Sequence, residues 1–232
     1  MTTHPLTLLD VDRDGAIEEA LDRVDGHSRA GFLRKAGLLT GALVGGGAAL
    51  GALAAPAGAA TAQDVAIANF ALTLEYLEAD FYTKAERSGA LSGRLARFAK
   101  VVGAHERGHV AALRKMLGSQ ALSKPTFDFK GATSNAAKFA QTAELLEDTG
   151  VAAYKGQAAR IQTDAILDAA LAIHSVEARH AAWIRHINGN PPAPAAFDQP
   201  QTMDAILAAV AKTGFITSSP QMTSQGRPAF TG

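Results

Sequence analysis

The chain of 232 residues contains no cysteine. That absence excludes disulfides, thiolate zinc sites, iron–sulfur clusters and cysteine nucleophiles, so any metal ion would have to be bound by His, Asp, Glu or Tyr. An excess of basic residues is also missing, because Lys+Arg and Asp+Glu both number 22. We therefore expect no nucleic-acid partner.

Charged residues are scarce as well, at 19% of the chain, whereas about 25% is usual in soluble domains. What the chain has in their place is alanine, with 50 residues of this type. Alanine favours helix more than any other residue. In such a background, a glutamate or histidine on the apolar face of a helix is informative.

Residues 1–62 have the layout of an export signal, with a basic stretch around Arg29, an uncharged segment at 38–60 and small residues up to Ala62. The basic stretch is similar to a twin-arginine signal, but Ala30 follows Arg29 where that signal has a second arginine. We expect export to the periplasm, the cell envelope or the medium. The alternative is an uncleaved membrane anchor, since the segment at 38–60 is just long enough to span a bilayer.

The spacing of apolar residues predicts four long helices and a short fifth one, and no strands. The predicted helices cover residues 63–88, 91–117, 135–158, 164–187 and 203–212. Helices of about 25 residues are ~37 Å long, which is the scale of a four-helix bundle. Short links join the first helix to the second and the third to the fourth, whereas the link between the second and third is long enough to cross the bundle.

We therefore predict an all-α fold with three parts. Residues 1–62 form the N-terminal tail with the export signal or anchor. Residues 63–215 form a four-helix bundle, with the long crossover between its second and third helices and a short C-terminal helix. Residues 216–232 form a C-terminal tail.

Two of the predicted helices carry an acid and a histidine within their apolar stripes. Glu106 and His109 lie at the centre of the stripe of the second helix, and Glu177 and His180 lie within that of the fourth. Burying an unpaired carboxylate costs several kcal/mol or forces its protonation. A divalent metal ion is a partner that would remove this cost.

The other two helices repeat each other in the same register. Glu75 is followed by Tyr82 and Glu147 by Tyr154, seven residues later in both cases, and a Glu-x-x-His begins 31 or 30 residues after the first Glu. The chain is thus two copies of one pattern. Folded with pseudo-twofold symmetry, the copies would bring four Glu and two His together, which is the ligand set of di-iron and di-manganese carboxylate bundles.

With these motifs the chain resembles the ferritin-like superfamily, and specifically exported ferritin-like proteins related to plant desiccation-related proteins. Residues 69–82 are similar to the first helix of that subgroup, and the resemblance covers residues 63–215. It implies two iron ions, or alternatively two manganese ions. It also implies that Tyr82 and Tyr154 hydrogen-bond to ligands across the core. The metal ligands that it implies are Glu75, Glu106, His109, Glu147, Glu177 and His180.

Glu78 is an alternative to Glu75, because it lies nearer the middle of the apolar stripe of their helix. The internal repeat favours Glu75, since Glu78 aligns with Gly150. We therefore keep Glu78 as a substitute or additional ligand. His105 is expected at the surface or rim, and two further histidines of the fourth helix are expected in solvent: His174 and His186.

The function expected from the resemblance is redox handling of O2, peroxide or Fe2+ by a dinuclear centre in the cell envelope, as a ferroxidase, peroxidase or catalase-like oxidoreductase. The alternative is a non-catalytic stress- or desiccation-related binding protein whose metal site is structural or lost. The expected partners are metal ions, O2 or peroxide, and a second copy of the chain in a homodimer. The pattern leaves open which side chains would be catalytic.

Overall fold

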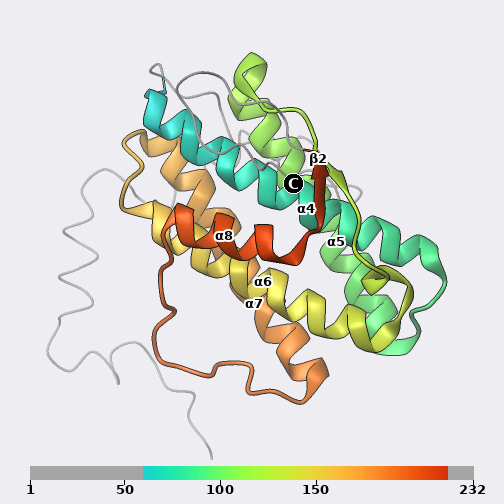
Figure 1. Cartoon of the computed structure of the whole chain (residues 1–232). Helices are drawn as coiled ribbons and strands as arrows, with labels where there is room; N and C mark the ends of the chain where they lie inside the picture. The colour runs from blue at the N-terminus through green and yellow to red at the C-terminus, as the bar shows by residue number, and fades with distance from the viewer. Residues whose placement is uncertain (1–59, 219–232) are drawn as a thin grey trace, which may run out of the picture. The chain divides into compact units, whose positions relative to one another are not determined.

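The computed structural model describes residues 60–218, and the predicted export segment and the residues after Ser218 lie outside this range. Within it the chain forms five α-helices and one two-stranded sheet (Figure 1). None of the described helices is long and apolar enough to cross a membrane. The helices are α4 (Ala62–Ser88), α5 (Gly93–Leu117), α6 (Ala136–Ala158), α7 (Asp164–Asn188) and α8 (Met203–Thr213).

The helix ends follow the local sequence, which is why the predicted bounds are confirmed to within two residues. The Thr61 side chain accepts a hydrogen bond from the Asp64 backbone N–H at 3.1 Å and caps α4. Gly89 ends the same helix in the left-handed region at φ 70°, which a residue with a side chain rarely adopts.

Asp64 joins two distant ends of helices. Its carboxylate is fully buried and accepts the Gln162 backbone N–H at 2.9 Å and the Thr163 hydroxyl at 2.6 Å. Thr163 is the N-cap residue of α7, but its hydroxyl donates to Asp64 and makes no capping bond. Asp64 thus attaches the first turn of α4 to the turn between α6 and α7.

The four long helices form the bundle in two pairs. α4 packs mainly against α5, and α6 mainly against α7, so each pair is one copy of the internal repeat (Figure 1). The predicted all-α bundle with a short C-terminal helix is confirmed. The crossover between α5 and α6 contains η2 (Gly118–Gln120), strand β1 (Thr126–Phe127) and η3 (Ala132–Ser134).

The crossover is attached to α4 by polar side chains. The Asn69 amide donates to the Gln120 carbonyl and accepts the Leu122 backbone N–H, both at 2.9 Å. Nearer the C-terminal end of α4, the Lys84 ammonium donates to the Phe127 carbonyl at 2.7 Å. Because backbone groups of an irregular segment need partners, these contacts fix its course along the bundle.

The prediction that the chain has no strands is wrong at one place. β1 pairs antiparallel with β2 (Ile216–Ser218), which follows α8, and the Asp128 backbone N–H donates to the Phe215 carbonyl at 2.8 Å. Strands of two and three residues are too short to show an alternating pattern in the sequence. The sheet connects the chain after α8 to the crossover.

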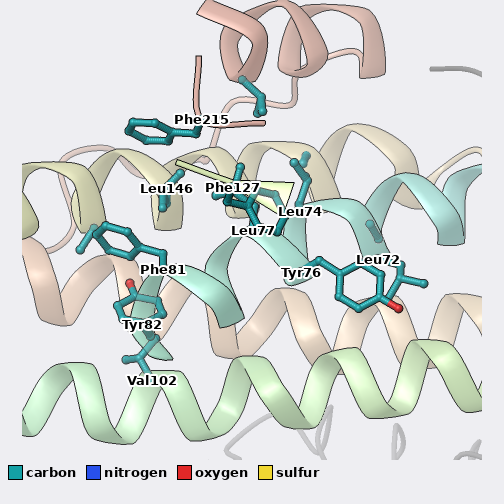
Figure 2. Packing of buried hydrophobic residues seen from close by; sticks show 14 of the residues in the cluster. Leu72, Leu74, Tyr76, Leu77, Phe81, Tyr82, Val102, Phe127, Leu146 and Phe215 are labelled. Atoms are coloured by element: carbon teal, nitrogen blue, oxygen red, sulfur yellow. The ribbon is translucent and has the colours of Figure 1, made fainter. Parts of the chain in front are cut away.

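Aromatic side chains fill one end of the bundle core. The ring of Phe81 stacks on that of Phe139 at 5.1 Å and meets that of Phe129 edge-on at 5.2 Å. Figure 2 shows Phe127 and Phe215 beside Leu146, where the two strands cover the core. This packing joins α4, α6, the crossover and the segment after α8.

A long segment leads from α7 back to α8 and passes close to α6 (Figure 1). The Gln201 backbone N–H donates to the Ala152 carbonyl at 3.1 Å, and a Cβ added to Gly156 would lie 1.8 Å from the Gln201 carbonyl oxygen. Only a glycine therefore lets the two backbones approach to this distance.

We expect Gly156→Ala to destabilise the fold, because the added methyl group overlaps backbone atoms that cannot move aside freely. The loss should be about 1–3 kcal/mol, or roughly 3–10 °C in Tm. Gly108→Ala is the matched control, since a Cβ at this helical position meets nothing within 4 Å. It should stabilise α5 by about 0.5–1 kcal/mol. Equal Tm changes in the two variants would contradict the close approach at Gly156.

Candidate metal centre

Seven acidic and imidazole side chains point into the interior of the bundle. They come from all four long helices, and each carboxylate among them is at most 3% exposed. The residues are Glu75, Glu78, Glu106, His109, Glu147, Glu177 and His180. A core with so many buried ionisable groups is costly unless they are compensated by protons or by cations.

The structure arranges six of these residues, which are the six predicted ligands, in two overlapping groups. In each group every residue offers one donor atom, and these atoms lie within 4.8 Å of one another. Glu106 and Glu177 belong to both groups, so they lie between two candidate metal positions. The first group is Glu75, Glu106, His109 and Glu177, and the second is Glu106, Glu147, Glu177 and His180.

The donor atoms of the second group converge without saturating one another. His180 Nδ1 lies 3.1 Å from Glu106 Oε1 and 3.2 Å from Glu147 Oε2, yet these three atoms are buried and form no hydrogen bond. Both Glu177 carboxylate oxygens are likewise buried without a hydrogen-bond partner. These nitrogen and oxygen atoms lie close together, but their angles do not allow hydrogen bonds. They instead surround a shared point at which a cation could bind. Carboxylates and imidazoles of this kind fit a divalent transition metal.

The two tyrosines of the repeat hold one carboxylate each across the bundle. The Tyr82 hydroxyl of α4 donates to Glu147 of α6, and the Tyr154 hydroxyl of α6 donates to Glu75 of α4. Burial raises the pKa of both phenols well above the usual value, so they stay protonated as donors. The exchange is reciprocal and leaves the second oxygen of each carboxylate for the centre.

Glu78 has no acidic counterpart in the second copy of the repeat. It is 3% exposed and belongs to neither group of donor atoms, whereas Glu75 belongs to the first. A Cβ added to Gly150, its counterpart in the repeat, would lie 3.5 Å from Glu78 Oε1 and 3.3 Å from Glu177 Oε2. A side chain at position 150 would therefore touch both carboxylates, most tightly that of Glu177, and Glu78 lies beside the centre.

The ionisable groups of the centre interact strongly with one another. Burial and the neighbouring carboxylates raise the pKa of Glu78 and Glu106 well above the usual value, and burial raises that of Glu147 to about 7. Burial also opposes ionisation of Glu177, but contacts with the two histidines outweigh it and lower its pKa to about 2. Without cations, the carboxylates share protons among themselves and with the imidazoles.

The histidines respond in the opposite way. Burial disfavours the imidazolium of His180, but its contacts with Glu106 and Glu147 dominate and raise its pKa to about 12. Burial disfavours the imidazolium of His109 as well, but Glu75, Glu106 and Glu177 surround its Nδ1 atom and raise its pKa well above the usual value. These protons would have to leave before either imidazole could bind a metal ion.

His105 lies at the surface, as predicted, and also contacts the centre. Its side chain is exposed, and its Nδ1 atom lies 2.8 Å from His180 Nε2; with ring centroids 5.1 Å apart and ring planes 18° apart, the two imidazoles meet edge to edge. Burial and the neighbouring imidazoles lower the pKa of His105. The sequence places His105 directly before Glu106, which gives His-Glu-x-x-His, a spacing known from metal sites, but this motif lies within α5 and does not indicate the contact with α7.

The other two histidines of α7 differ from each other. His186 is exposed, as predicted. The prediction that His174 is in solvent is wrong, because the residue is half-buried and its Nε2 atom is enclosed without a hydrogen-bond partner among residues 60–218. Neither residue belongs to the two groups of donor atoms.

The metal-free chain should lose stability as the pH rises from 5.5 to 8.5. Compared with the unfolded chain, the folded state binds an extra proton at Glu147 between about pH 4.5 and pH 7, and another at His180 above pH 6.5. A rise in pH lowers the concentration of free protons and therefore favours the unfolded chain, which binds fewer of them. Thermal unfolding of chelator-treated protein should show a Tm lower by about 5 °C at the higher pH. Glu147→Gln should reduce this slope below pH 7. A Tm that rises over the same range would contradict the assignment of the protons.

A comparison with known families agrees with this geometry. A family model described as a ferritin-like domain matches residues 63–190, which is more than half of the chain and includes the helices α4 to α7 that carry the centre. No curated protein matches the chain. The resemblance to the ferritin-like superfamily is thereby confirmed. The chain therefore belongs to the ferritin-like domain family.

Proposed function

We propose that the chain is a dinuclear metal protein that binds two iron or two manganese ions and reacts with O2, peroxide or Fe2+. The observation that supports this most directly is the convergence of donor atoms from four helices, five of which, on Glu106, Glu147, Glu177 and His180, are buried without a hydrogen-bond partner. Carboxylates and imidazoles suit both metals. Such ions, when bound, supply an exchangeable electron and open positions for a small oxygen-containing substrate.

The chain's own residues have separate tasks in this proposal. Glu75 and His109 would hold one ion, and Glu147 and His180 the other. Glu106 and Glu177 would be shared between them, since both belong to the two groups of donor atoms. The phenol protons of the tyrosines stay on oxygen and fix the outer carboxylate oxygens, so the inner oxygens keep their directions.

A second candidate is a structural metal site in a stress- or desiccation-related protein without turnover. The observation in its favour is that α4, α5, α6 and α7 each supply at least one donor atom. Bound ions would then join all four helices and add their binding free energy to the stability of the bundle. For either function, the cell envelope as the compartment is a proposal that rests on the sequence of residues 1–62.

Metal analysis of the full-length chain tests the centre. After chelation and reconstitution with Fe2+ without oxygen, or with Mn2+, we expect about two ions per chain. Glu106→Gln and Glu177→Gln should each reduce this to below about 0.5, because each removes a ligand from both positions. Glu86→Gln is the matched control, since Glu86 pairs with Arg107 and belongs to neither group. Fewer than about 0.2 ions per wild-type chain would contradict the proposal.

Turnover separates the two candidates. The metal-loaded wild-type chain should consume O2 or H2O2 at least about tenfold faster than the same amount of free metal, if the centre is catalytic. Consumption at the rate of free metal, together with a Tm that falls on chelation, would favour the structural site. The Glu177→Gln variant reports the background rate without a complete centre.

A further inference from the structure

The ring of His180 has a partner on each side. Its Nδ1 atom faces the carboxylates of Glu106 and Glu147, whereas its Nε2 atom lies 2.8 Å from His105 Nδ1. The two rings are nearly parallel, at 18°. His105 comes from α5 and His180 from α7, so this contact also spans two helices.

This geometry determines where the protons lie when a metal ion is bound. If Nδ1 of His180 is the donor atom, the remaining proton of the neutral ring must be on Nε2. That N–H needs an acceptor, and His105 Nδ1 lies within hydrogen-bond distance. Such outer partners of ligating histidines fix the ring orientation and increase ligand basicity.

The internal repeat does not provide the same partner on the other side. Aligning Glu106 with Glu177 places His105 opposite Val176, so the residue that precedes the second Glu-x-x-His is apolar. Valine can neither donate nor accept a hydrogen bond through its side chain. The two halves of the centre therefore differ in how their histidines are supported.

We propose that His105 is a positioning residue that holds His180 with its proton on Nε2, and thereby strengthens metal binding in the group of Glu106, Glu147, Glu177 and His180. The inference rests on the proposed dinuclear centre. It adds that the two metal positions are unequal, and that an exposed residue outside the ligand set controls one of them.

Calorimetric titration of the chelator-treated, full-length chain with Co2+ tests the inference. The wild-type chain should bind two ions. His105→Leu should weaken one binding step about 10–100-fold and leave the other unchanged. His105→Asn should restore the affinity to within about threefold of the wild type, because its side-chain oxygen can accept the same proton. His186→Leu, which removes an exposed histidine of α7, is the matched control and should have no effect.

Nitrogen-15 NMR of labelled histidines gives a readout that does not depend on metal affinity. In the metal-free wild-type chain, His180 Nε2 should carry a proton protected from exchange with water. In His105→Leu that proton should exchange faster, and in His105→Asn protection should return. These spectra also show whether the leucine variant is folded.

The outcomes are distinct. Two wild-type binding steps that are both unchanged in His105→Leu would overturn the inference and leave the dinuclear centre intact. Equal weakening of both steps, without rescue by asparagine, would overturn it in favour of general loss of packing. A wild-type chain that binds no Co2+ would contradict the proposed function, and an unprotected His180 Nε2 proton would then overturn the hydrogen bond as well.

Discussion

Five carboxylates buried side by side are the constraint on which the rest of the structure depends. Carboxylates of like charge in a core of low dielectric cannot all ionise without compensation. The histidines of both Glu-x-x-His motifs supply part of it, and burial with the neighbouring carboxylates raises the pKa of Glu78 and Glu106, which favours their protonated forms. Divalent cations would replace these protons, so metal binding and proton release are coupled in this bundle.

The sequence was sufficient for the fold and for the group of six residues. Alanine-rich helices with regular apolar stripes have clear ends, and a glutamate inside such a stripe is expensive enough to be informative. The contact of His105 with His180 was not predictable in the same way, because it depends on how two helices are rotated against each other. The β1–β2 pair was missed because strands of two and three residues are too short to show a periodic pattern in the sequence.

The two copies of the repeat have the same residues at the positions of the donor atoms but different residues around them. Glu75 and Glu147, and likewise Tyr82 and Tyr154, occupy equivalent positions and exchange hydrogen bonds across the core. The position of Glu78 corresponds to a glycine, and that of His105 to a valine. Two halves that share the same ligands therefore have different surroundings, which is one way for a duplicated pattern to acquire two unequal positions.

The attachment of Asp64 to Gln162 and Thr163 has a consequence for the order of folding. The contact joins residues 98 and 99 positions apart, whereas contacts within each helix pair are much closer in sequence. Closing so long a loop costs chain entropy before any contact is gained. The α4–α5 hairpin can therefore assemble early, but this end of the bundle closes only after the chain has been synthesised past α6.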